Sequence, residues 1–339
     1  MSDNHLAPGK PKSDLRRMLP GLGISLLAVA LLLTQVDAGT IIADLQKADF
    51  RYLPLIILLF LISMFSRAFG WRAILQGKIS VSRAFWTVNQ GYFLNNLLPF
   101  RLGEIGRAFL LNRTEGLPFW EVLPTIMIER IFDVAFTAGM LLISLSFVVS
   151  ESSNQLIAYI ILALVAIGFM VLFLTVRNQG TVMKWFERLA ARWAWLNKFG
   201  KERLASTLEG AAALGETKLF IKVFAWFAIT WGFTIALYYT MLLAYFPQAE
   251  LVWATFSLGS LAMGVAIPSS PAQIGVYEWA LAFPLTIVGM PQSLALSYAV
   301  VAHAVFFLFT TALGAIGLAR DGASLSDLYK QLRNRAGKL

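Results

Sequence analysis

The chain carries long apolar stretches, one after another, along its 339 residues. A helix of about 20 apolar residues spans the hydrocarbon core of a bilayer. Six stretches have this length, at roughly 18–36, 52–75, 121–148, 155–176, 219–246 and 293–318. Charged residues make up only 14% of the sequence, whereas a soluble domain carries about 25%. These features predict an all-α polytopic membrane protein with about six transmembrane helices.

Two further apolar stretches, roughly 84–113 and 251–289, are interrupted near their middles by proline, glycine and polar residues. We expect each to form a re-entrant hairpin, which enters the membrane and leaves it on the same side. With both termini inside, six spans and two hairpins place nearly all Lys and Arg residues on one face, as the positive-inside rule requires. The sequence therefore predicts a multi-pass protein of the inner (cytoplasmic) cell membrane, with cytoplasmic N- and C-termini.

The segment 181–214 mixes aromatic and aliphatic residues with Lys and Arg. One interpretation is an amphipathic helix that lies on the cytoplasmic leaflet. The other is a connector that only covers the helix bundle.

The two interrupted stretches share a short pattern, Pro99 to Gly103 in the first and Pro271 to Gly275 in the second. Each has a predicted span before it and another after it. We therefore expect a single membrane domain, 1–339, with an inverted repeat of about 52–148 and about 219–318. Transporters often have this plan, with the substrate at broken helices near the midplane. The predicted hinge residues are Pro99, Gly103, Pro268, Pro271 and Gly275.

The second interruption contains a helix-start pattern. Ser270 is a candidate N-cap, Pro271 suits the first helical position, and Gln273 completes a capping box. This predicts a helix that begins at Pro271 with its N-terminus inside the bilayer, where free N–H groups bind anions. The alternative is a capped break without a ligand.

Charged residues lie beside these interruptions and inside one span, although a charge at the bilayer centre costs at least about 2.5–3.5 kcal/mol. They are Arg101, Glu104, Arg107, Glu129, Arg130, Asp133 and Glu278. Thr125, Glu129, Asp133 and Thr137 recur every fourth residue and share one helix face. We expect Arg101 or Arg107 to pair with Glu129 or Asp133. These charges either line a path or form an ion-pair network that fixes helix register.

Polar residues without charge also lie in the apolar stretches. We expect packing roles for Asn89 and Gln90, and leave the roles of Asn95 and Asn96 open. His303 has no acidic neighbour on its own helix face, which favours a helix–helix hydrogen bond over a proton relay.

Several functional classes are disfavoured. The chain has no cysteine and two histidines, so thiolate and histidine metal sites are not expected, and no cofactor is predicted. The Gly-x-x-x-x-Gly-Lys phosphate loop is absent, which disfavours direct use of ATP. The net charge of +9 fits basic cytoplasmic loops, so no nucleic acid partner is expected.

Three segments, taken in order, resemble the signatures of a known family. They are Gly91 to Arg107, Glu129 to Asp133 and Pro268 to Glu278. The chain is similar over about 15–320 to the lysylphosphatidylglycerol synthase transmembrane region family, also called flippase-like. It departs at Ala272 and Gln273, where relatives usually have glycines, and we expect this break to be less flexible.

The resemblance implies a polytopic fold and a link to lipids. In the best-known relatives this region translocates an aminoacylated phospholipid, and others are linked to polyprenyl-phosphate sugar pathways. The chain ends about twenty residues after its last predicted span, so the soluble synthase domain of those relatives is not expected. The leading hypothesis is a lipid translocase, and the alternatives are a membrane enzyme on lipid phosphates or a non-transporting accessory protein.

The expected partner is a membrane lipid, namely an anionic or aminoacylated phospholipid or a polyprenyl phosphate, and a homo-oligomer stays open. The predicted substrate-binding residues are Asn95, Asn96, Arg101, Glu104, Arg107, Glu129, Arg130, Asp133, Ser269, Ser270, Gln273 and Glu278. Arginines would hold a phosphate, and carboxylates would balance them, bind a cationic headgroup or carry a proton.

Overall fold

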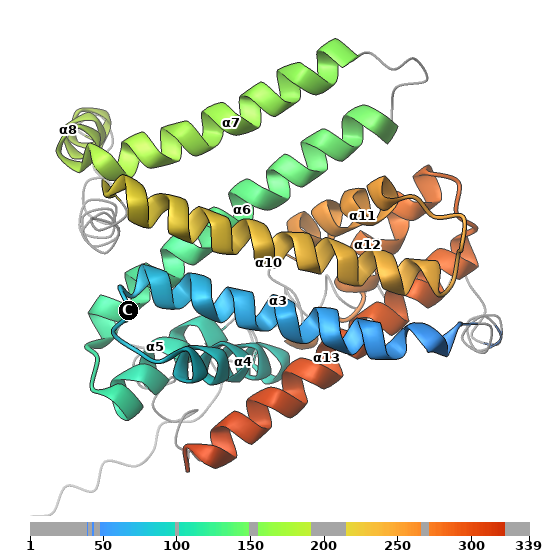
Figure 1. Cartoon of the computed structure of the whole chain (residues 1–339), viewed down its shortest axis with the longest axis horizontal. Coiled ribbons are helices and arrows are strands. Elements are labelled where there is room, and N and C mark those ends of the chain that lie inside the picture. The colour runs from blue at the N-terminus through green and yellow to red at the C-terminus, as the bar shows by residue number, and fades with distance from the viewer. Residues whose placement is uncertain are drawn as a thin grey trace, which may run out of the picture.

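The computed structural model describes residues 48–98, 102–148, 155–190, 215–265 and 271–322, together with Gly39 and Ala43. Every regular element in these ranges is a helix (Figure 1). In chain order they are η1 (Phe50–Tyr52), α3 (Leu53–Ile74), α4 (Val81–Leu97), α5 (Leu102–Glu115), α6 (Phe119–Val148), α7 (Gln155–Arg177), α8 (Gln179–Ala190), α10 (Thr217–Leu243), α11 (Leu251–Gly264), η4 (Pro271–Gln273), α12 (Val276–Ile287) and α13 (Gln292–Arg320). The all-α prediction is confirmed for this part of the chain.

Four helical segments are long and apolar enough to cross a membrane: Phe50–Ile74, Phe119–Val148, Thr217–Leu243 and Gln292–Arg320. They correspond to four of the six predicted spans. The predicted span 155–176 is α7, which bends by 92° into α8, and this bent pair would make a fifth. The predicted span 18–36 lies outside the described residues. The chain is therefore a polytopic membrane protein.

Both interrupted stretches fold into helical hairpins. Their helices α4, α5, α11 and α12 have 17, 14, 14 and 12 residues. At 1.5 Å per residue, each is too short to cross a hydrocarbon core of about 30 Å alone. Small residues allow the hairpins to close, as is common between membrane helices. A Cβ atom on Gly103 would lie 2.0 Å from the carbonyl oxygen of Gly91, and one on Gly264 would lie 2.4 Å from Cβ of Ala280.

The helices of the two halves exchange partners. The first spans, α3 and α10, pack along each other. Helix α4 of the first hairpin packs on α13, and α11 of the second hairpin packs on α6. A glycine lies at each of these hairpin contacts, with Gly314 against α4 and Gly259 against Leu141. These contacts are reciprocal between the two halves. The inverted repeat of 52–148 and 219–318 stays a prediction.

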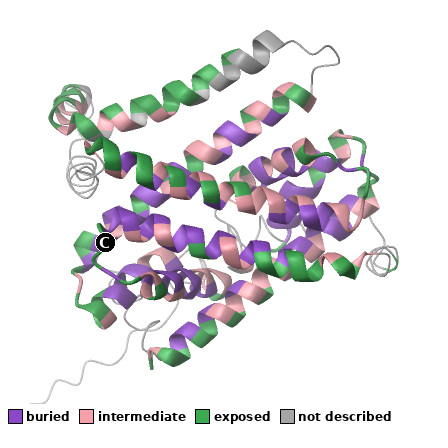
Figure 2. Ribbon diagram, viewed as in Figure 1, coloured by how far each residue is buried: buried purple, intermediate pink, exposed green. Residues whose placement is uncertain are grey.

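Helix α7 lies outside this inner group (Figure 2). It packs on α6, and one end of it joins a phenylalanine cluster with α6 and α10 that includes Phe132, Phe136, Phe169 and Phe224. Helix α8 follows the sharp bend and exposes Trp185. This is the orientation expected of an amphipathic helix on the membrane surface. It covers the first part of the predicted segment 181–214, whose residues after Ala190 lie outside the described ones.

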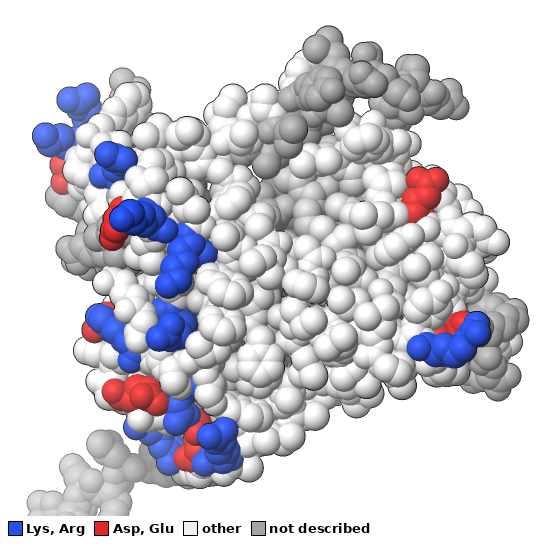
Figure 3. Space-filling model, viewed as in Figure 1, with Lys and Arg blue, Asp and Glu red and all other residues white. Residues whose placement is uncertain are grey.

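Charged side chains gather at two ends of the face shown in Figure 3, with a broad uncharged belt between them. Basic residues mark the ends of several helices on one side, among them Arg72 on α3, Arg113 on α5, Arg177 on α7 and Arg320 on α13. An uncharged belt of this kind is the surface that a bilayer core requires.

Candidate functional site

The two interruptions meet at one cavity of about 250 Å³. The first interruption contributes Asn95 and Asn96 from the end of α4 and Glu104 from α5. The second contributes Ala272 and Gln273 of η4. Spans from both halves complete the wall with apolar and aromatic side chains on one hand and polar and charged ones on the other. The structure thus joins two segments that lie about 170 residues apart in the sequence.

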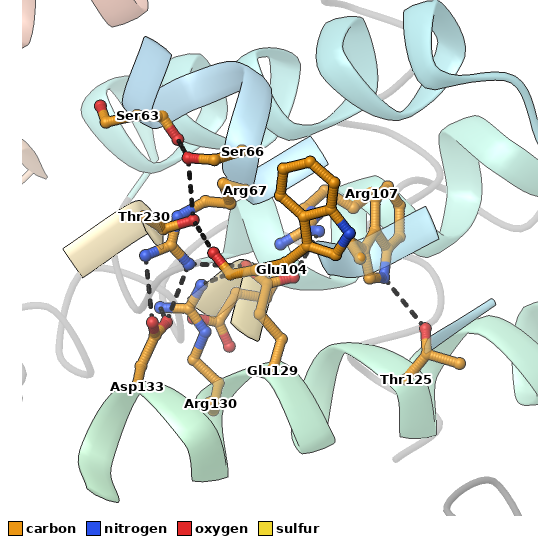
Figure 4. A network of polar contacts seen from close by, with 12 residues as sticks. Ser63, Ser66, Arg67, Glu104, Arg107, Thr125, Glu129, Arg130, Asp133 and Thr230 are labelled. Atoms are coloured by element: carbon orange, nitrogen blue, oxygen red, sulfur yellow. Dashed lines mark hydrogen bonds and ion pairs between the residues drawn. The ribbon is translucent and has the colours of Figure 1, made fainter. Parts of the chain in front are cut away.

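A polar face of α6 forms the ionic side of the site. Thr125, Glu129, Asp133 and Thr137 are all buried, as the spacing predicted for a face turned toward protein. Arg67 of α3 lies opposite two of them (Figure 4). Its Nη1 donates to Oε1 of Glu129 at 2.9 Å and to Oδ2 of Asp133 at 3.0 Å, and its Nη2 donates to Oδ1 of Asp133 at 3.0 Å.

Arg107 lies behind the cavity rather than in its lining. Its Nη2 donates to Oε2 of Glu129 at 2.6 Å, which confirms the expected pairing between α5 and α6. Its guanidinium carbon lies 3.9 Å from the ring centroid of Trp71, and the Trp71 indole N–H donates to Thr125 at 3.1 Å. Only 3% of Arg107 is exposed. The geometry therefore gives Arg107 a positioning role for Glu129.

Arg130 is the arginine of the network with the most exposed side chain, at 30%. It lines the cavity and lies 3.0 Å from Glu129, 3.3 Å from Asp133 and 3.6 Å from Glu104. Arg67, Arg107 and Arg130 therefore carry three positive charges against the three negative charges of Glu104, Glu129 and Asp133. Such balance lowers the cost of burying these groups in the membrane.

The predicted start of a helix at Pro271, in the second interruption, is wrong. Pro271–Gln273 form a short 3₁₀ turn, and α12 begins only at Val276. Ala272 and Gln273 have φ angles of 56° and 61°, which cannot continue a right-handed helix. Gly275, with φ of 87°, is the N-cap, and Oε2 of Glu278 accepts its N–H at 2.6 Å. Glu278 thus takes the capping place predicted for Gln273.

Glu278 also links the break to the last span. Its Oε1 lies 2.6 Å from Nδ1 of His303 on α13. The helix–helix hydrogen bond expected for His303 is therefore confirmed, and its acidic partner comes from α12. The His303 ring stacks on Tyr277 with centroids 4.1 Å apart, and the Tyr277 hydroxyl bonds that of Tyr238. His303, Tyr277 and Tyr238 all line the cavity.

The amides near the first break hold it in shape. Oδ1 of Asn95 accepts the Gly103 N–H at 2.8 Å, which ties α4 to α5 across the interruption. Nδ2 of Asn96 lies 3.0 Å from the hydroxyls of Thr310 and Thr311 on α13.

Deeper in the bundle, Asn89 and Gln90 are fully buried. Gln90 donates to Asp321 at 2.7 Å, in keeping with the packing role expected for it.

Five predicted residues lie outside the described ones, namely Pro99, Arg101, Pro268, Ser269 and Ser270. One residue of the site was missed. Arg67 is not among the predicted site residues, yet it lies at the centre of the network. It precedes the end of α3 by seven residues, or about 10 Å of helix. That depth, in a span with no acidic residue of its own, is the signal that would have indicated a partner on another helix.

Comparisons with known proteins indicate one family of membrane proteins. Residues 18–314 match the sequence profile of the lysylphosphatidylglycerol synthase TM region family. The chain is 26% identical to a UPF0104 membrane protein of Methanocaldococcus jannaschii, over 66% of this chain and 92% of that protein. It is 24% identical to a UPF0104 membrane protein of Methanothermobacter thermautotrophicus, over 86% of this chain and 90% of that one.

A third relative is the glycosyltransferase AglD of Haloferax volcanii. It is 24% identical over 85% of this chain, but only 52% of the relative is covered. Because the family profile spans well over half of the sequence and agrees with the helical membrane architecture, the chain belongs to the lysylphosphatidylglycerol synthase transmembrane region family.

Proposed function

We propose that this protein translocates a membrane lipid, whose headgroup passes through the cavity while its chains stay in the bilayer. The observation that carries the proposal is the convergence of both helix interruptions on one cavity with charged walls. Ionisable residues at membrane depth are costly and typically mark a substrate path. Irregular backbone at that depth is tolerated where it lines a cavity, which is the usual place of a transporter's binding site.

The cavity offers groups of both signs to a headgroup. Arg67 and Arg130 lie on one wall with Glu104 and Asp133. A guanidinium pairs well with a phosphate, and the exposed part of Arg130 is the group best placed to do so. The carboxylates would balance the arginines or bind an amine. A phosphate role for Arg101 remains a prediction.

We place the basic ends of α3, α5, α7 and α13 at the cytoplasmic face of the cell membrane, following the positive-inside rule. Each predicted hairpin would then open to one side, the first to the cytoplasm and the second to the exterior. Headgroups could thus reach the cavity from either leaflet.

The names of the relatives guide the choice of lipids for a test. The family description refers to lysylphosphatidylglycerol, and one relative is called a glycosyltransferase. A panel of phosphatidylglycerol, an aminoacylated phosphatidylglycerol and a polyprenyl phosphate covers the lipid classes that these names and the resemblance imply.

The test measures movement of each labelled lipid between leaflets of proteoliposomes. Wild type is compared with Arg130→Gln, with Arg101→Ala and with Arg188→Gln, which removes an exposed arginine of α8 as a control. We expect one lipid to move, with movement lost in the first two variants and kept in the control. Size-exclusion chromatography confirms that each variant is folded. Absence of movement for every lipid, or equal movement in all four proteins, would contradict the proposal.

A further inference from the structure

A second hollow, of about 580 Å³, lies between α6 and α7. We call it the α6–α7 groove. On α6 it is lined by one helix face from Met127 to Leu142, and on α7 by Leu164, Gly168 and Phe169. At 1.5 Å per residue the α6 face is about 22 Å long. That length exceeds the roughly 15 Å of hydrocarbon in one leaflet, so the groove is long enough for a single lipid chain.

Small residues line the groove without closing it. They are Ala135, Ala138 and Gly139 on α6 and Gly168 on α7. Small residues between membrane helices usually allow the backbones to approach closely. Here a Cβ atom added at Gly168 would meet nothing within 4 Å. The described residues therefore leave this space unfilled, and inside a bilayer it has room for a hydrocarbon chain.

The groove and the cavity share a wall. Arg130 and Val134 line both of them. Arg130 is the sole charged side chain among the described residues that line the groove, and the others are apolar. The polar cavity therefore adjoins the apolar groove at Arg130, whose side chain is partly exposed. This is the arrangement of a lipid itself, with a charged head next to a hydrocarbon chain.

The phenylalanine cluster of α6, α7 and α10 lies where the α7 wall of the groove ends, at Phe169. Phe169 lines the groove and contacts Phe136 and Phe224, with ring centroids 5.0 and 4.9 Å apart. Beyond this cluster, toward the basic ends of the helices, α7 is packed against its neighbours (Figure 1). A chain in the groove would thus extend from the level of Arg130 away from the basic end.

We propose that the α6–α7 groove binds one acyl chain of a diacyl phospholipid whose headgroup phosphate pairs with Arg130 in the cavity. This inference rests on the proposed function and names the chain-binding part of its site. A furrow between two helices admits a single chain, so the second acyl chain stays in the surrounding bilayer. A polyprenyl chain is considerably longer than one leaflet and fits a groove of about 22 Å less well.

The experiment uses the full chain in vesicles of phosphatidylethanolamine and phosphatidylglycerol. The probe is phosphatidylglycerol with a photoreactive diazirine in the middle of one acyl chain. A parallel arm uses a polyprenyl phosphate with a diazirine in its chain. Labelled peptides are mapped by mass spectrometry, and phospholipid movement is measured on the same samples.

Two variants of α7 form a matched pair. Gly168→Trp places an indole in the groove, and its Cβ would meet no described atom within 4 Å. Ala166→Trp adds the same side chain two residues away, at an exposed position on the opposite face of the helix. In wild type and Ala166→Trp we expect the phospholipid probe to label the groove faces of α6 and α7. In Gly168→Trp we expect this labelling and the lipid movement to be lost.

The outcomes distinguish a failure of the acyl-chain proposal from a failure of the proposed translocase function. Groove labelling that Gly168→Trp removes, in a protein that moves no lipid, supports the groove and overturns the proposed function. Lipid movement that is equal in both variants overturns the groove as a substrate site and leaves the function intact. Labelling spread evenly over all lipid-facing helices, or groove labelling by the polyprenyl probe alone, overturns the acyl-chain assignment.

Discussion

At the scale of single residues, the ionic contacts of the site converge on Glu129. This carboxylate is fully buried and contacts Arg67, Arg107 and Arg130, which come from α3, α5 and α6. It thereby fixes three helices around one point. Removal of one member of a buried ionic network leaves the others uncompensated, and this costs about 3–5 kcal/mol.

Glu129→Gln should therefore lower the free energy of unfolding by about 3–5 kcal/mol. The matched control is Glu121→Gln on the same helix, which removes an exposed pair with Lys78 and should cost about 0–1 kcal/mol. Denaturant titration of both variants in detergent micelles measures the difference. Equal stability losses would show that the network does not hold the helices together.

A second residue-scale prediction concerns the left-handed backbone at Ala272 and Gln273. Such a conformation costs roughly 1–2 kcal/mol for an L-residue, and glycine escapes most of that cost. Ala272→Gly should thus stabilise the protein by about 1 kcal/mol. Ala304→Gly, at an exposed helical position of α13, should destabilise it by about 1 kcal/mol. The thermal unfolding temperature should rise in Ala272→Gly and fall in Ala304→Gly. A loss of stability in Ala272→Gly would count against the turn geometry.

At the scale of elements, the hairpins depend on backbone contact between short helices. The first hairpin closes through Gly91 and Gly103, and Asn95 bonds the Gly103 N–H across the interruption. Because α4 and α5 are each too short to span the bilayer, their tips lie at membrane depth and must satisfy their polar groups within the protein. The glycines and the amide are the means by which the chain does so.

Gly103→Ala should prevent closure of the first hairpin, since its Cβ would lie 2.0 Å from the Gly91 carbonyl oxygen. Gly232→Ala on α10 is the control, because its Cβ would have nothing within 4 Å. It should be neutral or stabilise the protein by up to about 1 kcal/mol. Yield of monodisperse protein after detergent extraction tests both. Normal yield and stability for Gly103→Ala would contradict the close packing.

At the scale of the whole molecule, the two halves exchange partners so that neither has a complete cavity wall alone. Helices α4 and α13, and likewise α6 and α11, join one half to the other. A relative rotation of the halves would move both interruptions at once and change access to the cavity. This is the usual basis of alternating access in transporters built from inverted repeats.

The proposed orientation is testable at the same scale, because the sequence has no cysteine. Single cysteines placed at Lys78 and at Arg51 lie near opposite ends of α3. In intact cells, a membrane-impermeant maleimide should label the Arg51→Cys variant and should label Lys78→Cys only after the membrane is opened. Labelling of both positions from outside would overturn the topology.

The sequence by itself determined the elements that depend on local composition. The length of the apolar runs identified four spans, and interruptions by proline and glycine identified the two hairpins. Spacing of four residues placed Glu129 and Asp133 on one buried face of α6. The motif order also indicated the family. The spans, the hairpins and the buried face follow from periodicity and from the cost of exposing polar groups to lipid, whereas the family follows from the resemblance of the three motifs.

The tertiary structure alone decided which charges meet. Arg67 lies near the end of its span in the sequence, yet its contacts with α6 place it at the centre of the ionic network. Arg107, which was expected to bind a phosphate, is buried outside the cavity lining. Helix α12 also begins at Val276 and not at the predicted Pro271, because the break adopts a left-handed turn that local capping signals do not encode. Ion pairs and turn geometry depend on segments distant in sequence, since a buried charge is stabilised only by the partner that the fold brings to it.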